Sequence, residues 1–218
     1  MMKYKVLFID EEKRQHDEFA DFMDKYQEKV ELTCCFPQPT LDTTIAMIDE
    51  LHPDAIVSDF KLNDIKEDIT YNVGFDGSEL MDAYLGERPG FPCFVLTSFD
   101  DQAIYRSHDL NIVYLKRDLH PGKDDKITFA DRIIQKIVCY QTEIAQSQDR
   151  LNELIELRRN NEATSEDEQE LIELDSFLER SLGKKTQVPD GMKELSNMNR
   201  LNELIGKANE ILAKLEGE

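Results

Sequence analysis

The chain has 218 residues, of which 40% are hydrophobic and 33% charged, a composition typical of a folded protein rather than a disordered one. With 26 basic and 46 acidic residues, its net charge of −20 repels phosphate backbones and anionic lipid headgroups. Nucleic acid and membrane surfaces are therefore disfavoured as direct partners, although an acidic surface also serves solubility and identifies no partner by itself.

The first 120 or so residues alternate short apolar runs with amphipathic segments, the pattern of an α/β domain with a parallel sheet. Five strands are expected, at residues 5–9, 30–36, 55–58, 91–96 and 111–115. Apolar side chains at three- and four-residue spacing predict helices between them, at residues 13–28, 40–51, 77–86 and 101–109. Right-handed crossovers then gather functional groups at the carboxyl ends of the strands.

After about residue 127 the strand signals end, and three helical stretches are expected, separated near residues 160–164 and 183–191. The first continues the last helix of the α/β domain with a heptad seam of Ile137, Tyr140, Ile144, Ser147, Leu151 and Leu154. The second opens with Ser165 and Glu168 as a capping box and carries Leu171, Leu174 and Leu178 on one side.

The third stretch repeats this pattern with Leu201, Leu204, Ala208, Ile211 and Leu215. Its hexapeptide Arg200–Ile205 repeats Arg150–Ile155 verbatim, which shared heptad chemistry explains more simply than duplication.

No stretch approaches the roughly 20 consecutive apolar residues that span a bilayer, and Met1–Val6 lacks the apolar segment of a signal peptide. We therefore expect a cytoplasmic protein. The cysteines form no CxxC pair and have no histidine cluster nearby, so neither zinc nor a disulfide framework is predicted for Cys34, Cys35, Cys93 and Cys139.

Polar residues of particular kinds follow the predicted strands. Asp10 and Glu11 follow the first, Asp59 the third, Thr97 and Ser98 the fourth, and Lys116 the fifth. Three converging carboxylates repel one another unless a hard divalent cation lies among them, and Mg²⁺ prefers such oxygen ligands. A carboxylate held there can attack a phosphoryl group, while the metal and an ammonium offset the charge on the phosphoryl oxygens. Asp59 fits the nucleophile, and Lys116 fits the counter-charge.

Four segments, Phe8–Glu12, Ile56–Asp59, Val95–Ser98 and Tyr114–Lys116, resemble in order and spacing the signature segments of response-regulator receiver domains. The resemblance covers roughly residues 3–135. It implies a flavodoxin-like, doubly wound parallel sheet of five strands in the order 2-1-3-4-5. The expected organisation is a receiver domain at 1–135 and an all-α extension, a coiled coil or helical bundle, at 136–218.

The resemblance also implies roles for individual residues. Asp59 is the expected phosphoacceptor, and Asp10, Glu11, Asp59 and the backbone carbonyl of Lys61 are the expected Mg²⁺ ligands. Thr97 is the expected switch hydroxyl and Lys116 the phosphoryl counter-charge. Such a receiver is no enzyme beyond its own phosphorylation and dephosphorylation, and a histidine kinase or phosphotransfer protein supplies the phosphoryl group.

The sequence departs from the family pattern in several places. Glu11 stands where aspartate is common, and Arg117 follows Lys116 where the family has a cis proline, so a trans bond is expected. Val113 occupies the usual aromatic position and Tyr114 lies beside it, either as an ordinary strand residue or next to a bulge.

About ten extra residues, near 63–75, separate Asp59 from Asp76 and form either a solvated loop or a partner-recognition loop. Phe99, two residues beyond Thr97, could slow loss of the phosphoryl group.

The tail indicates how the signal leaves the domain. Residues 127–218 contain 19 acidic and 12 basic side chains, a net charge of −7 that disfavours direct DNA binding. We therefore expect output through an unknown protein partner. The heptads are compatible with a homodimer through the tail and with an antiparallel bundle. The alternative function is a receiver-like interaction scaffold that is not phosphorylated and binds partners through the insertion and the helices.

Overall fold

The computed structural model describes residues 3–63, 72–98, 109–120 and 127–181. Three predicted features lie outside these ranges wholly or in large part: the core of the insertion, the helix at 101–109 and the third tail stretch. The chain forms two compact units, Met1–Glu143 and Ile144–Glu218. Both this division and the boundary expected at 135/136 fall within one long helix.

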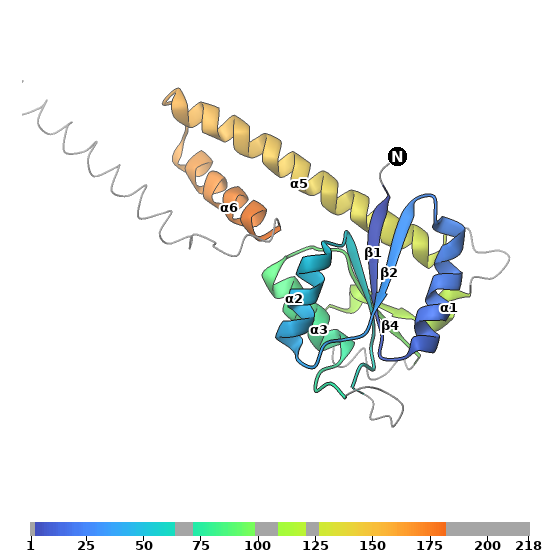
Figure 1. Cartoon of the computed structure of the whole chain (residues 1–218). Coiled ribbons are helices and arrows are strands. Elements are labelled where there is room, and N and C mark those ends of the chain that lie inside the picture. The colour runs from blue at the N-terminus through green and yellow to red at the C-terminus, as the bar shows by residue number, and fades with distance from the viewer. Residues whose placement is uncertain (1–2, 64–71, 99–108, 121–126, 182–218) are drawn as a thin grey trace, which may run out of the picture. The chain divides into compact units, whose positions relative to one another are not determined.

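The first unit is an α/β domain with a single parallel sheet (Figure 1). The sheet order is β2-β1-β3-β4-β5, as the resemblance implied, and each neighbouring pair is parallel. Its elements are β1 (Tyr4–Ile9), α1 (Lys13–Met23), η1 (Asp24–Tyr26), β2 (Val30–Cys35), α2 (Leu41–Leu51), β3 (Ala55–Asp59), α3 (Gly77–Glu87), β4 (Cys93–Thr97), η2 (Leu110–Ile112), β5 (Val113–Leu115), η3 (Lys116–Leu119) and the start of α5 (Phe129–Arg159).

The central strands are apolar runs because helices cover both faces of the sheet. Every residue of β3 and β4 is buried. Side chains alternate along β1, so that Val6 and Phe8 lie in one core with Phe19 of α1 and Ile133 of α5. The strands run between α1 on one side and α2 and α3 on the other (Figure 1). The carboxyl ends of the strands thus form one edge, as the crossovers predicted.

Local capping sets where the helices begin. Thr40 caps α2 and Asp76 caps α3, each in a reciprocal capping box with the third helical residue. Thr128 and Asp131 bond each other's backbone N–H groups at the start of α5. The first predicted helix is shorter than expected, because α1 ends at Met23 and continues only as the 3₁₀ turn η1.

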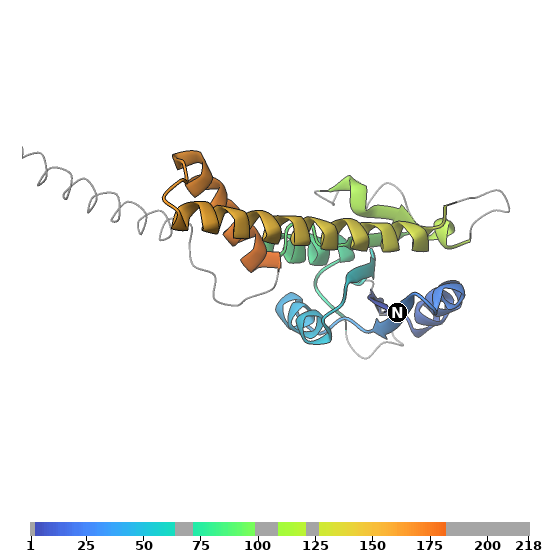
Figure 2. The same ribbon diagram turned by 90° about the horizontal axis from the view of Figure 1, so that it is seen from above.

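The second unit contains the carboxyl-terminal part of α5 and the helix α6 (Ser165–Ser181). α5 is continuous over 31 residues, which confirms that the last helix of the α/β domain runs on into the heptad stretch (Figure 2). The predicted capping box of Ser165 and Glu168 is wrong by one residue. Thr164 and Asp167 form the box, because the Thr164 hydroxyl accepts from the N–H of Asp167.

Ion pairs join the two helices of this unit. Arg150 pairs with Glu170, and Arg158 pairs with Glu168. Within the described ranges, no helix combines the length and apolarity that crossing a bilayer requires.

Candidate functional site

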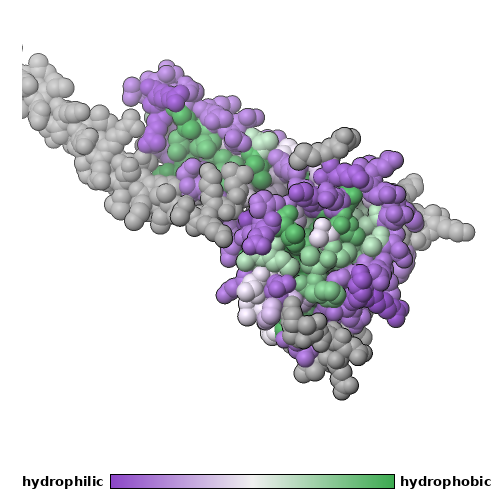
Figure 3. All heavy atoms as spheres, viewed as in Figure 1, coloured by the Kyte–Doolittle hydropathy of each residue, from purple (hydrophilic) through white to green (hydrophobic). Residues whose placement is uncertain are grey.

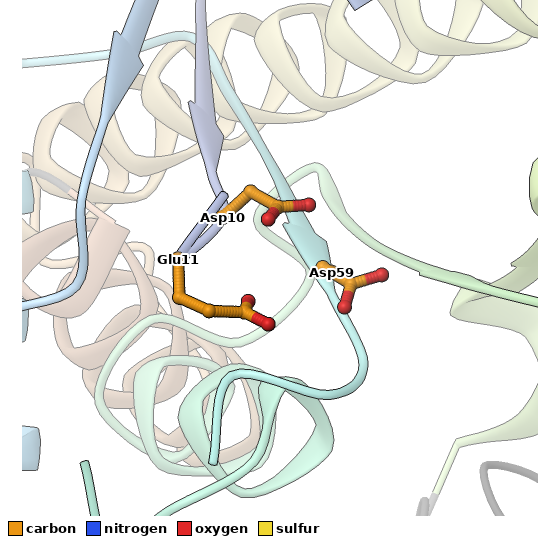
Figure 4. Close-up of side chains that lie close together, drawn as sticks. All are labelled: Asp10, Glu11 and Asp59. Atoms are coloured by element: carbon orange, nitrogen blue, oxygen red, sulfur yellow. The ribbon is translucent and has the colours of Figure 1, made fainter. Parts of the chain in front are cut away.

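Three carboxylates meet at the carboxyl edge of the sheet. Asp10 and Glu11 directly follow β1, and Asp59 is the last residue of β3. One oxygen from each lies within 4.8 Å of the other two, and the side chains point toward a common space (Figure 4). The structure therefore brings together the acidic residues that the sequence singled out, because parallel strands end at the same edge.

Burial makes this cluster electrostatically costly. Asp10 is 1% exposed, Glu11 7% and Asp59 5%. Desolvation, followed by the charge of Asp59, raises the pKa of Asp10 to about 8. Asp10 Oδ1 accepts from the N–H of Glu12 at 2.8 Å, but buried Oδ2 has no hydrogen-bond partner among the described residues. An oxygen in that position suits a cation as its partner.

Lys116 supplies one positive charge to this cluster. Its Nζ lies 2.7 Å from Asp59 Oδ1 and 3.8 Å from Asp10 Oδ2. It also donates to Gln15 Oε1 at 3.0 Å. One ammonium against three carboxylates leaves an excess of negative charge, and this all-oxygen donor set fits Mg²⁺.

The backbone around Asp59 is held by hydrogen bonds that leave its carboxylate facing the cluster. The N–H of Lys61 donates to Asp59 Oδ2 at 3.0 Å, and the N–H of Phe60 donates to the carbonyl of Leu96. Lys61 thus contacts Asp59 through its backbone N–H, while its carbonyl as a metal ligand stays a prediction.

Gly77 is a site residue that sequence reasoning missed. A Cβ built there would lie 2.0 Å from the carbonyl oxygen of Asp59, closer than any side chain can approach. The N–H of Gly77 donates to the carbonyl of Phe60 at 2.8 Å. α3 can therefore begin against the end of β3 only because this position is glycine. The available signal in the sequence was a glycine directly after the capping Asp76.

Gln15 and His16 of α1 were also missed. Gln15 lies one helical turn after Glu11, a spacing that places it over the same edge. The His16 ring is buried and its Nε2 lies 2.9 Å from the carbonyl oxygen of Asp10. Burial lowers the pKa of His16, which favours a neutral ring that donates to this carbonyl.

The structure resolves the two alternatives for Tyr114. It pairs in register with Leu96, and its ring lies 5.7 Å from that of Phe94 and 5.0 Å from that of Phe129. It is therefore an ordinary strand residue, packed beneath α5. Every peptide bond in the described ranges is trans, so the bond between Lys116 and Arg117 is trans as expected, within the 3₁₀ turn η3.

Thr97 ends β4 and is 2% exposed. The preceding residue, Leu96, lies in register with Asp59, so Thr97 stands at the same edge of the sheet as Asp59. Ser98 is exposed, and Phe99 lies outside the described residues. The roles predicted for Thr97 and Phe99 stay predictions.

No protein-family model and no curated protein matches the chain. A fusion containing residues 181–211 of the trimeric coiled coil of yeast Spc42 is similar at 18% identity and a TM-score of 0.48, over 74% of this chain and 94% of that one. NtrX from Brucella abortus in complex with ADP is similar at 20% identity and a TM-score of 0.43, over 71% of this chain but only 34% of the NtrX chain.

The isolated receiver domain of RcsB from Salmonella enterica serovar Typhimurium, in the presence of phosphomimetic BeF₃⁻, matches at 19% identity and a TM-score of 0.41. That match covers 55% of this chain and 84% of the RcsB domain. The fold assignment for this chain rests on its strand order, β2-β1-β3-β4-β5. The unit Met1–Glu143 therefore has the flavodoxin-like fold of response-regulator receiver domains.

Proposed function

We propose that this protein is a two-component response regulator that accepts a phosphoryl group on Asp59. A histidine kinase or phosphotransfer protein is the donor. The observation that carries the proposal is the buried group of Asp10, Glu11 and Asp59 with the Lys116 ammonium 2.7 Å from Asp59. A structural ion pair needs one carboxylate, whereas three buried carboxylates beside one lysine suit a site that handles metal and phosphoryl charge.

The proposed reaction is a phosphoryl transfer between two proteins. A carboxylate oxygen of Asp59 attacks the phosphorus, the phosphorus–nitrogen bond of a phosphohistidine breaks, and the imidazole takes up a proton. Bound Mg²⁺ would neutralise the charge that develops on the phosphoryl oxygens. Asp10 and Glu11 would hold the metal, and Lys116 would pair with a phosphoryl oxygen. Water later breaks the acyl phosphate and releases inorganic phosphate.

The proposed output is a protein contact made by the helical extension. Tail residues 127–218 carry a net charge of −7 by sequence, which opposes binding to a phosphate backbone. Tyr114 is packed against Phe94 and Phe129, so its side chain supports the contact between β5 and α5. We infer that phosphorylation is reported through this contact rather than by an aromatic side chain that moves to the surface.

Intact-mass measurement tests the acceptor directly. The full chain is incubated with Mg²⁺ and acetyl phosphate or phosphoramidate, beside Asp59→Asn and the control Asp17→Asn. Asp17 is an exposed aspartate on α1 that pairs with Lys13. The wild type and Asp17→Asn should gain one phosphoryl group, and Asp59→Asn should gain none.

Absence of uptake from every donor, together with no response to beryllofluoride, would instead support the interaction scaffold. Uptake that persists in Asp59→Asn would move the acceptor to another residue.

A further inference from the structure

α6 carries a wider apolar face than contact with one helix requires. At 3.6 residues per turn its apolar side chains span an arc of roughly 220°. They are Leu171, Ile172, Leu174, Phe177 and Leu178. A helix that packs on one neighbour needs about 100°. Figure 3 shows green apolar surface on this unit, bordered by hydrophilic residues.

α5 takes only the middle of this arc. Ion pairs from α5 reach Glu170 and Glu168, which lie on either side of the line through Leu171 and Leu178. Ile172 lies roughly 120° around the helix from that line, yet it is only 5% exposed. That position lies outside the roughly 100° that one neighbouring helix covers.

The segment of α5 that bonds to α6 has the same amino-acid sequence as a segment later in the chain. Arg150 donates to both carboxylate oxygens of Glu170, at 3.0 and 2.7 Å, and Leu154, one turn along the same face, is 0% exposed. Both belong to the hexapeptide Arg150–Ile155, and Arg200–Ile205 has the same six residues. Arg200 and Leu204 therefore offer the same pair of contacts, a guanidinium and an apolar side chain four residues on.

Charge also matches the second segment to α6. A basic residue recurs at every seventh position alongside the apolar heptad positions of this segment. These residues are Lys193, Arg200, Lys207 and Lys214. This is the position that Arg150 holds before Leu151, and cations flanking a heptad seam commonly pair with carboxylates of the facing helix. α6 carries seven acidic residues and one basic residue, Arg180. Three of the seven, Asp167, Glu168 and Glu170, already pair with α5.

We propose that residues 193–215 form a third helix that docks on α6 of the same chain and closes a three-helix bundle. The connecting residues 182–192 can span roughly 36 Å, whereas α6, at 17 residues, is about 25 Å long. Either end of α6 is therefore within reach. A short flexible connection gives an effective concentration on the order of millimolar, which favours this segment over the same segment of another molecule.

Hydrogen exchange of the full chain tests this docking. Leu204→Asp with Ile211→Asp places two charges on the seam, and Asn202→Asp with Asn209→Asp places two charges on the opposite face as the matched control. Exchange is followed in peptides covering 165–181, with sheet peptides of the first unit as the internal reference, and mass is measured by light scattering over a range of concentrations.

The seam variant should raise exchange in α6 by at least about tenfold, while the control variant and the sheet peptides stay unchanged. Protection of α6 in the wild type should not depend on concentration. Equal exchange in both variants and the wild type would overturn the proposal. Protection that grows together with a dimer mass would overturn the same-chain docking and assign the surface to a second copy.

Discussion

Lys116 Nζ lies 2.7 Å from Asp59 Oδ1, although the two residues come from the ends of β5 and β3, with β4 between them in the sheet. The same ammonium is 3.8 Å from Asp10 Oδ2. Lys116 thus compensates the buried charge of Asp59 and lies beside the carboxyl group of Asp10. In the proposed function it serves the phosphoryl group as well, so its removal should affect both stability and phosphorylation.

Lys116→Met should lower the free energy of unfolding by about 1–3 kcal/mol in the absence of Mg²⁺, because it leaves the buried carboxylate of Asp59 uncompensated. Added Mg²⁺ should restore part of this loss. Urea unfolding with and without the metal measures both effects. The control Lys13→Met removes an exposed pair with Asp17 and should cost below about 0.5 kcal/mol. Equal losses in the two variants would contradict a compensating role for Lys116.

Gly77→Ala and Gly86→Ala should change the free energy of unfolding in opposite directions, although both glycines lie in α3. At Gly77 the new Cβ meets the carbonyl oxygen of Asp59, so stability should fall by about 1–3 kcal/mol and phosphoryl uptake should slow. At Gly86 nothing lies within 4 Å, so alanine should stabilise the helix by about 0.5–1 kcal/mol. The two variants are compared by thermal unfolding and by the rate of phosphoryl uptake. A Gly77→Ala variant with unchanged stability and uptake would show that α3 can shift away from Asp59.

Magnesium affinity should rise with pH up to about 8. Burial and Asp59 raise the pKa of Asp10 to about 8, so the metal-free site holds a proton that Mg²⁺ displaces. Calorimetry in two buffers of different ionisation enthalpy measures that proton. Asp10→Asn should weaken binding and remove most of the pH dependence. An affinity that is flat below pH 8 in the wild type would contradict this linkage.

The raised pKa of Asp10 makes magnesium affinity rise with pH, but it makes the free energy of unfolding of the metal-free protein fall with pH. In the unfolded chain Asp10 ionises near 3.8, its ordinary value, whereas in the folded chain it keeps its proton to about 8. The contribution of Asp10 to the free energy of unfolding should therefore decrease as the pH rises through this range. Asp10→Asn should flatten this slope in pH-dependent urea unfolding without metal, and an unchanged slope would assign it to other groups.

Thr128→Ala should lower the free energy of unfolding by about 1 kcal/mol, because it removes the cap of α5. The cap lowers the pKa of Asp131 through its bonds from the Thr128 N–H and hydroxyl. The contribution of the cap to the free energy of unfolding should be complete above pH 3.8, the ordinary pKa of an aspartate. It should be lost as the pH falls through the lowered pKa of Asp131. Asp131→Asn, which cannot ionise, should remove this acid dependence in pH-dependent urea unfolding, and Asp149→Asn, an exposed change within α5, should leave it unaltered.

The sequence alone was enough to locate the strands of the sheet and to identify the acidic residues at its carboxyl edge. Apolar runs located all five strands, because burial on both faces leaves the central strands few polar positions, and these lie at the carboxyl ends of β3 and β4. The residues after those runs, Asp10, Glu11 and Asp59, then had to share one edge, because parallel strands end together. The strand order itself came from the resemblance of four short segments to a known family.

Only the tertiary structure decided the contacts that depend on how helices are rotated and how closely they approach the sheet. Gln15 meets Lys116 across 101 positions of sequence, and the Gly77 backbone lies against Asp59. Tyr114 packs under α5 because β5 faces that helix. Periodicity tells which face of an element is buried, but not the distance or angle at which another element meets it, and those distances determine what surrounds Asp59.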